Sequence, residues 1–302
     1  MAETPLIAVV GTANLDLIAT VDELPEAGQT VLATAYEELP GGKGLNQARA
    51  AARAGSAALV AAIGTDAAGE ALLDAARRAA VDVSHAPRLV GASGRALIAV
   101  DTHAENSIVV FAGVGAELDG PAVTAALDSL SPRTVLAQCE VSADAQIAAA
   151  AWARAHAARF VWNCSPVADG ALEVLADADP VIVNRGEARE LLLRLAREGA
   201  LPAEATHEDA WPENELPRAL AGFARSVVVT LGSRGALWRD SSGADGTVSA
   251  VPVAHVVDTT GAGDEFAGAF TAALASGATF GEASARAAAA GAHAVATPRA
   301  LR

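Results

Sequence analysis

Short apolar runs bounded by Gly, Asn or Pro recur along the chain and predict buried strands. Runs this short and continuous are typical of strands that are covered on both faces, as in a parallel sheet. The runs are Leu6 to Val10, Leu59 to Ile63, Val135 to Ala137, Phe160 to Trp162, Val181 to Val183 and Val227 to Thr230.

Alanine-rich segments with a helical pattern separate these runs. They are Leu45 to Ala54, Gly69 to Ala80, Ala143 to Ala158, Glu187 to Glu198 and Gly263 to Ser276. Glycine follows the first and the last of them, and glycine is the usual residue just beyond a helix. Alternating strands and helices predict an α/β fold, a three-layer α/β/α sandwich around a mostly parallel central sheet.

Two regions, residues 15–40 and 95–111, instead alternate polar and apolar side chains with turn residues between them. This pattern predicts half-exposed antiparallel strands that form a second, smaller sheet. Placed at the carboxyl ends of the parallel strands, that sheet would act as a lid over the ligand site. We therefore expect a single domain over residues 1–302 with inserted lid strands, and a surface loop over Gly199 to Pro217.

Composition narrows the class of partner. Hydrophobic residues form 52% of the chain, which is ample for a core, and the formal net charge of −15 disfavours nucleic acid and anionic membrane as main partners. Small molecules are expected instead. An acidic start at Met1 to Pro5 and the lack of a long apolar run predict a cytoplasmic protein. Cys139 and Cys164 lie far apart in the sequence and are expected to be reduced thiols.

A glycine-rich segment late in the chain is the strongest candidate for chemistry. Val256-Val257 is expected to end a strand, and Gly261-Ala262-Gly263 opens a helix near Asp264. Free N–H groups at a helix start form an anion site, for which phosphate is the obvious ligand. Asp264 is then either the general base that takes a proton from an attacking hydroxyl, or an acid that stabilises the helix start.

A second glycine cluster, Pro40 to Ala48, also leads into a helix but lacks the spacing of a Walker loop. Its Lys43, the only lysine in the chain, and its Asn46 suit a site that hydrogen-bonds several hydroxyls. Asn14 and Asp16 follow the first strand at a spacing of two, on one side of the chain. Each of these residues could equally belong to a turn.

Two further segments have alternative interpretations. Thr230-Leu231-Gly232-Ser233-Arg234-Gly235 follows a strand and is either a plain β-turn or a loop that contacts a nucleotide. Asn184-Arg185-Gly186-Glu187 has the spacing of a capping box, and could also contact phosphate and the waters of Mg²⁺. The histidines show no spacing that suggests metal ligands.

Taken in order, these segments closely resemble the ribokinase/PfkB carbohydrate kinase family. Both family signatures are present, Gly41-Gly42-Lys43-Gly44-x-Asn46-Gln47-Ala48 and Asp258-Thr259-Thr260-Gly261-Ala262-Gly263-Asp264, and the resemblance runs from Gly11 to about Ala300. It implies an ATP-dependent kinase with a parallel sheet and a β-sheet lid, and a homodimer joined through the lids.

The resemblance also implies roles for individual residues. Asp264 would be the base, and Gly261, Ala262 and Gly263 the anion hole. The sugar would contact Asn14, Asp16, Gly42, Lys43, Asn46 and Glu140. ATP would contact Asn184, Gly263, Thr230, Leu231, Gly232, Ser233, Arg234 and Gly235. Glu187 would order Mg²⁺. A monovalent cation, K⁺, would be bound by Asp258 and the Thr260 carbonyl, with carbonyls near Ala294, Thr297 and Arg299.

Gln47 after Asn46, together with Asn14 and Asp16, is most similar to the ribokinases within the family, so D-ribose is the first expected substrate. The alternatives are another kinase of the family, for fructose, deoxyribose or a nucleoside, and a non-catalytic sugar or nucleotide sensor on the same fold. A dinucleotide-dependent dehydrogenase is disfavoured because no G-x-G-x-x-G follows the first strand.

Overall fold

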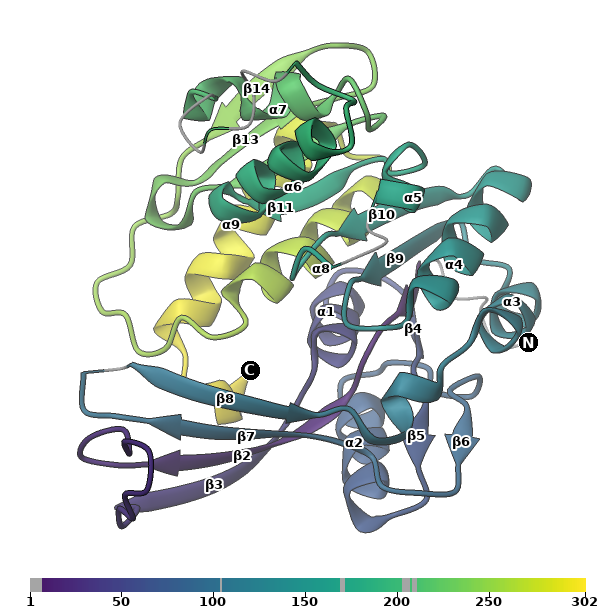
Figure 1. Cartoon of the computed structure of the whole chain (residues 1–302). Helices are drawn as coiled ribbons and strands as arrows, with labels where there is room; N and C mark the ends of the chain where they lie inside the picture. Colours follow the sequence, from purple (N-terminus) through teal and green to yellow (C-terminus); the bar gives the residue numbers. More distant parts are fainter. Residues whose placement is uncertain (1–6, 104, 169–171, 203–206, 208–210) are drawn as a thin grey trace.

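The structure is a computed structural model that describes residues 7–103, 105–168, 172–202, 207 and 211–302. Residues 1–5, used above to predict location, and Leu6, at the start of the first predicted strand, lie outside the described residues. Figure 1 shows one large sheet with helices on both of its faces, and a smaller sheet that lies below it in the view.

The central sheet has eight strands in the order β14-β13-β12-β11-β10-β9-β1-β4. Six of them pair in parallel, and these match the predicted apolar runs: β1 (Ile7–Val10), β4 (Ala57–Val60), β9 (Thr134–Gln138), β10 (Arg159–Asn163), β11 (Val181–Asn184) and β12 (Val227–Thr230). An antiparallel hairpin, β13 (Ala236–Arg239) and β14 (Asp245–Val248), completes one edge. The run predicted to end at Ile63 leaves the sheet earlier, because Ile63 begins the short β5 (Ile63–Gly64), which pairs with β6 (Arg88–Leu89).

The parallel strands are mostly apolar because each strand contributes side chains to both hydrophobic cores. In β1, Val9 packs into one core and Val10 into the other, as the period of two requires. One core is closed by α1 (Lys43–Ala52), α2 (Ala67–Arg78), α8 (Ala262–Ala275) and α9 (Phe280–Ala296). The other is closed by α3 (Gly120–Leu130), α4 (Ala143–Ala155), α5 (Leu172–Leu175), α6 (Arg185–Arg197) and α7 (Leu216–Leu220). The predicted three layers and five predicted helices are therefore present.

The smaller sheet, here called the lid sheet, has four strands in the order β3-β2-β7-β8. They are β2 (Asn14–Thr20), β3 (Ala35–Gly41), β7 (Gly94–Val100) and β8 (Asn106–Phe111). The pairs β2–β3 and β7–β8 are antiparallel hairpins, but β2 and β7 run parallel. This differs from the antiparallel expectation because the chain passes through α1, β4 and α2 between those two strands, so no hairpin links them.

Two local predictions were wrong. Val256 and Val257 form no strand: both are more than half exposed, and the Val257 N–H donates to the Val295 carbonyl at the end of α9, at 2.7 Å. Their branched side chains suit a strand, but β14 already forms the edge of the sheet. The loop predicted over residues 199–217 is wrong at its end, where a 3₁₀ turn (Glu213–Glu215) and α7 begin and Leu216 is buried. Proline is tolerated in that first turn. Residues 203–206 and 208–210 of this loop lie outside the described residues.

Among the described residues, no helix is both long and apolar enough to span a bilayer.

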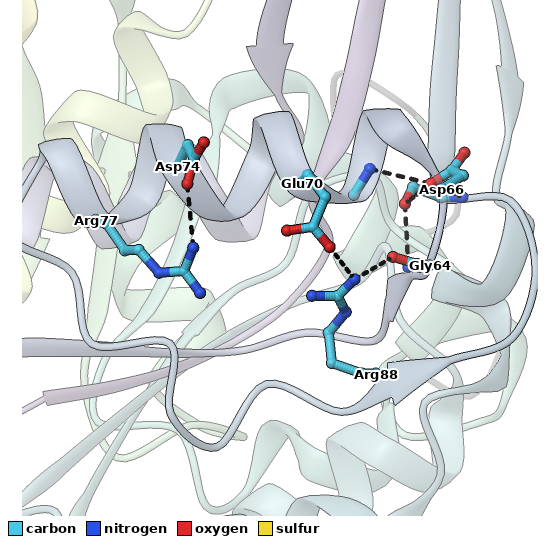
Figure 2. Close-up of polar contacts among 8 residues, drawn as sticks. Gly64, Asp66, Glu70, Asp74, Arg77 and Arg88 are labelled. Atoms are coloured by element: carbon cyan, nitrogen blue, oxygen red, sulfur yellow. Dashed lines mark hydrogen bonds and ion pairs between the residues drawn. The ribbon is translucent and has the colours of Figure 1, made fainter.

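The lid sheet is fastened to the central domain at Asp66, the residue that caps α2. One carboxylate oxygen accepts from the Gly69 N–H at 3.0 Å and from the Ser93 hydroxyl at 2.7 Å, and the other accepts from Arg95 at 2.8 Å. Ser93 and Arg95 flank the start of β7. Nearby, Arg88 bridges Glu70 and the Gly64 carbonyl (Figure 2). Helix α2 and the root of the lid are therefore held by one carboxylate.

We expect Asp66→Asn to destabilise the protein in a pH-dependent way. Burial acts to raise the pKa of Asp66, but the hydrogen bonds from Ser93, Gly69 and Arg95 outweigh it and lower the pKa overall. A carboxyl with a depressed folded pKa stabilises the fold fully above its unfolded pKa, about 3.9, and this stabilisation is lost as pH falls toward the folded pKa. At pH 7 the variant should lose about 1–2 kcal/mol of unfolding free energy, the scale of hydrogen bonds to a partly exposed charge.

Urea unfolding of both proteins at pH 7, 5 and 3 measures this difference. It should be equal at pH 7 and 5 and smaller at pH 3. A difference that grows toward low pH would contradict the assignment.

Candidate active site

Close packing of α1 against α8 creates the site. Gly268 on α8 lies against α1 so tightly that a Cβ atom there would be 2.5 Å from both the Ala50 Cβ and the Gln47 carbonyl. Only glycine permits that approach without a shift of the helices. An ion pair between Arg53 and Glu265 joins the same two helices. The side chains at positions 46 and 47 can therefore reach the first turn of α8.

Asp264 lies in that first turn, with 7% of its surface exposed. Its carboxylate accepts two hydrogen bonds from α1, from Asn46 Nδ2 at 3.0 Å and from Gln47 Nε2 at 2.9 Å. The N-cap residue of α8, Gly261, has no side-chain cap, and the Asp264 carboxylate is bonded to α1 rather than to the backbone at its own helix start. Hydrogen bonds to an ionised group contribute about 1.5–3 kcal/mol each, which offsets the cost of burying this charge. Of the two interpretations of Asp264, a fixed base fits this geometry better.

Gln47 connects Asp264 to the central sheet, a role that the sequence analysis did not assign. Gln47 is fully buried, and its Nε2 donates to Asp264 and to Asn163 Oδ1 at 2.8 Å. Its Oε1 accepts from Gln138 Nε2 at 2.8 Å. Asn163 in turn donates to the Ile182 carbonyl at 3.0 Å. Gln138 and Asn163 are the last residues of β9 and β10, and Ile182 lies in β11, so Asp264 is connected through Gln47 to three parallel strands.

The loop before α8 is held by its own turns. The Thr260 N–H donates to the Asp258 carboxylate at 2.8 Å, and the Ala262 N–H donates to the Thr259 carbonyl at 3.2 Å. Gly261 adopts a φ of 76°, which favours glycine. The first N–H groups of a helix have no acceptor within the helix, and they carry its positive dipole end. Because Ala262 is engaged in the turn, Gly261 and Gly263 are the better candidates for an anion hole.

The predicted sugar-binding residues gather beside Asp264. Asn14 and Asp16 are buried on the same side of β2, and the backbone of Asn14 lies against Gly42. Glu140 accepts from the Thr12 hydroxyl and, at 3.2 Å, from the Lys43 N–H. Six predicted residues thus come together: Asn14, Asp16, Gly42, Lys43, Asn46 and Glu140.

Asp16 also has a partner that the sequence analysis did not predict. Its carboxylate forms an ion pair with Arg299, whose side chain is 13% exposed. Burial raises the pKa of Asp16, Arg299 counteracts this rise, and the charge of Asp264 adds to it. Asp16 and Asp264 are therefore close enough to influence each other, as two groups around one substrate would be.

Five of the predicted nucleotide residues, together with Arg185 and Gly186, line a pocket of about 400 Å³, whereas the predicted Gly263 does not line it. The five are Asn184, Thr230, Leu231, Gly232 and Arg234. Ser233 and Gly235 complete the turn between β12 and β13, which contains the 3₁₀ turn Gly232–Arg234. Asn184 and Glu187 form a full capping box at α6. Asn184 both caps α6 and lines the pocket, and residues of the turn after β12 also line it. For each segment, the structural and the nucleotide-binding interpretations are therefore compatible.

The predicted monovalent-cation site is filled by a side chain. Asp258, Thr260 and Thr297 do come together, but the guanidinium of Arg302 lies among their oxygens. The Ala294 carbonyl accepts from the Thr297 N–H, and the Arg299 carbonyl accepts from the Arg302 N–H. These residues do not fit a free K⁺ ion.

The family model for pfkB family carbohydrate kinases matches residues 4–301. The chain belongs to this family. Ribokinase from Bacillus subtilis is 31% identical over 274 residues, which cover 90% of this chain and 86% of that protein. The structure of Arabidopsis thaliana ribokinase complexed with ribose and ATP has a TM-score of 0.84 and 26% identity, and the match covers 99% of this chain and 95% of that one.

Ribokinase from Cryptococcus neoformans, solved in complex with ADP, gives a TM-score of 0.82 and 28% identity, with 99% and 96% coverage. The family match confirms that the chain is an ATP-dependent sugar kinase and that the fold is the predicted α/β/α sandwich with a lid sheet. Which sugar it phosphorylates is a separate question.

We expect Gln47→Leu to lower turnover more than substrate affinity. The substitution leaves one oxygen of Asp264 without its donor and frees the base to move, and a misplacement of about 1 Å can cost about 100-fold in rate. We therefore expect kcat to fall about 10- to 100-fold while KM for the sugar changes little, because the buried Gln47 is covered by other groups.

Steady-state kinetics should be compared with those of Gln146→Leu, which removes another buried glutamine, on the far side of the sheet. That control should lose stability but retain kcat. Equal losses of kcat in the two variants would show that Gln47 acts only through the stability of the fold.

Proposed function

We propose that this kinase transfers the γ-phosphoryl group of ATP to the primary hydroxyl of D-ribose, giving ribose 5-phosphate and ADP. The observation that carries the proposal is the nearly buried Asp264, fixed by Asn46 and Gln47 at the start of α8 beside the buried polar pair Asn14 and Asp16. A carboxylate fixed between a helix N-terminus and hydroxyl-binding groups suits phosphoryl transfer to an alcohol.

Each group has one task in the proposed reaction. Asp264 accepts the proton of the attacking hydroxyl as the new P–O bond forms and the bond to the ADP oxygen breaks. The N–H groups of Gly261 and Gly263 stabilise charge that develops on the transferred phosphoryl. Asn14, Asp16 and Lys43 orient the sugar, and the pocket between Asn184 and Thr230 receives the nucleotide. A positioned reactant pair lowers the barrier without any covalent intermediate.

Mg²⁺ is proposed to bind with ATP near Glu187. No cluster of three or more His, Cys, Asp or Glu in the described part of the chain could hold a metal ion by itself. Mg²⁺ usually binds through one or two carboxylates, substrate phosphates and water, so the Glu187 carboxylate beside the nucleotide pocket fits this mode. When bound, the ion neutralises charge on the phosphates.

Ribose is favoured by the polar set Asn14, Asp16 and Asn46, which can hydrogen-bond several hydroxyls. The Arg299 guanidinium on Asp16 is the one observation that favours a different acceptor, because a cation beside the sugar site would suit a phosphorylated sugar. Fructose, deoxyribose, nucleosides and fructose phosphates are therefore the acceptors to compare with ribose.

A coupled ADP-release screen of these acceptors tests the proposal, with ribose expected to give the highest kcat/KM. Asp264→Asn should retain ligand binding and lose about 10²- to 10⁴-fold in kcat, the usual contribution of a positioned base. The matched control is Glu265→Gln, since the neighbouring Glu265 pairs with Arg53 instead. It should keep kcat within a few-fold. Near-normal turnover by Asp264→Asn would refute the base, and a higher kcat/KM for another acceptor would refute ribose.

We also propose a homodimer joined through the lid sheets. Strand β8 is an edge strand, and all six of its residues are exposed, including Ile108, Val109, Val110 and Phe111 at 51–63%. An exposed apolar edge strand is a site where another sheet can pair or pack. A second copy of the chain presents the same self-complementary edge, which suits a twofold interface.

Val109→Lys should therefore convert a dimer into a monomer, because it buries a charge in the proposed interface. Ile147→Lys, at a partly exposed position on α4, is the control and should not alter the assembly. Sedimentation equilibrium measures both masses. A monomeric wild-type protein, or a Val109→Lys variant that remains dimeric, would contradict the proposed interface.

A further inference from the structure

Four oxygen atoms converge just before the active-site helix, and the guanidinium of Arg302 lies among them. Its Nη2 donates to the Asp258 carbonyl at 2.7 Å and lies 3.6 Å from the Asp258 carboxylate. Its Nη1 donates to the Thr260 carbonyl, and its Nε donates to the Thr297 carbonyl at 2.9 Å. Only 7% of the Arg302 side chain is exposed. The guanidinium thus joins the loop before α8 to the chain that follows α9.

Three carbonyl oxygens and a carboxylate are the ligand chemistry of a hard cation. Guanidinium carries one positive charge and five N–H donors in a planar fork, so it can satisfy such a set of oxygens by hydrogen bonds. Burial acts to lower the pKa of Arg302, and the charge of Asp258 opposes this effect. The group remains protonated at neutral pH, as arginine does in proteins.

We propose that Arg302 is a positioning residue that serves as a built-in monovalent cation, so that catalysis by this kinase does not need K⁺. The proposal rests on the proposed role of residues 258–264 as the anion-hole loop. The proposal explains why these four oxygen atoms do not fit a free K⁺ ion. The Arg302 side chain occupies the space between them and supplies the positive charge.

The peptide between Thr260 and Gly261 is the physical link to catalysis. In a trans peptide the C=O and N–H point in opposite directions. Holding the Thr260 carbonyl on Arg302 therefore directs the Gly261 N–H away from Arg302, toward the anion hole. The guanidinium also lies close to Gly261 itself, because a Cβ atom placed on Gly261 would be 3.8 Å from Arg302 Nη1. Arg302 thus orients one anion-hole donor and adds positive charge behind it.

The neighbouring arginines have different partners. Arg49 donates to the backbone oxygen of Arg302, and Arg299 pairs with Asp16. The 3₁₀ turn Arg299–Leu301 fixes the backbone that precedes Arg302, through Leu301 N–H to the Pro298 carbonyl at 2.9 Å. Among these three arginines, the side-chain contacts to the loop come from Arg302, so substituting it removes these contacts and leaves the ion pair of Arg299 with Asp16 in place.

The test compares wild type, Arg302→Ala and Arg302→Lys in KCl and in choline chloride of equal ionic strength, with the acceptor that gives the highest ADP release. Wild type should differ less than twofold between the salts. Arg302→Ala should lose about 10- to 100-fold in kcat in choline chloride, less than the roughly 100- to 1,000-fold cost of removing an oriented donor, because the Gly261 N–H is still present. Added K⁺ or guanidinium should restore a large part of it. Arg302→Lys, which keeps a cation, should stay independent of K⁺.

Thermal unfolding without substrate provides a readout that does not require turnover. KCl, compared with choline chloride, should raise the melting temperature of Arg302→Ala and leave that of wild type unchanged. Arg133→Ala, at an exposed position before β9, is the control and should behave as wild type in both assays.

Activation of the wild type by K⁺ would overturn the proposal, as would full activity of Arg302→Ala in choline chloride. A loss in Arg302→Ala that neither K⁺ nor guanidinium relieves would also overturn it, by assigning Arg302 to packing alone. If the wild type releases ADP with none of the acceptors, the proposed function fails, but the melting temperatures still decide the cation role.

Discussion

The need to keep one ionised carboxylate nearly buried, yet within reach of a substrate, governs the architecture around α8. A charge at the position of Asp264 is costly unless strong hydrogen bonds replace the water it loses. Asn46 and Gln47 supply these bonds, but only because α1 and α8 approach closely at Gly268. The small residues between α1 and α8 are therefore necessary for this arrangement, since a wider separation of the helices would leave the Asp264 carboxylate without its two hydrogen-bond donors.

The Asp264 carboxylate is also connected to the central sheet, through Gln47. Gln47 uses its amide fully, donating to Asp264 and Asn163 and accepting from Gln138, so that it cannot rotate without leaving a buried group unpaired. Asn163 and Gln138 lie at the ends of two neighbouring parallel strands, whose relative positions are fixed by the sheet. Asp264, the proposed base, is thus supported by the sheet and lies on a helix, a combination that fixes its position without a loop.

Most of the fold could be predicted from the sequence, because strands buried on both faces leave continuous apolar runs and glycine or capping residues delimit the helices. The pair Val256-Val257 misled the prediction because branched residues favour strands wherever a partner strand exists, and β14 already ends the sheet. In the site, local motifs identified Asp264 and Asn46. The contacts of Gln138 and Asn163 could not be predicted, because they depend on the register of the strands. Each of these two polar residues directly follows a predicted apolar run, however, and that position was a usable signal. Arg299 and Arg302 gave no such signal, because their partners Asp16 and Asp258 are distant in sequence.

Charge placement explains why these two arginines matter in an acidic protein. The chain has a formal net charge of −15, which opposes the approach of a polyanion such as ATP, and the site itself contains Asp16, Asp264 and Asp258. Arg299 pairs with Asp16 on β2, and Arg302 pairs with Asp258 in the loop before α8. Asp264 instead is held by neutral amides, which fix its position without neutralising its charge. Arginine is thus paired with Asp16 and Asp258, whereas amides hold Asp264, the carboxylate that we propose takes up the proton.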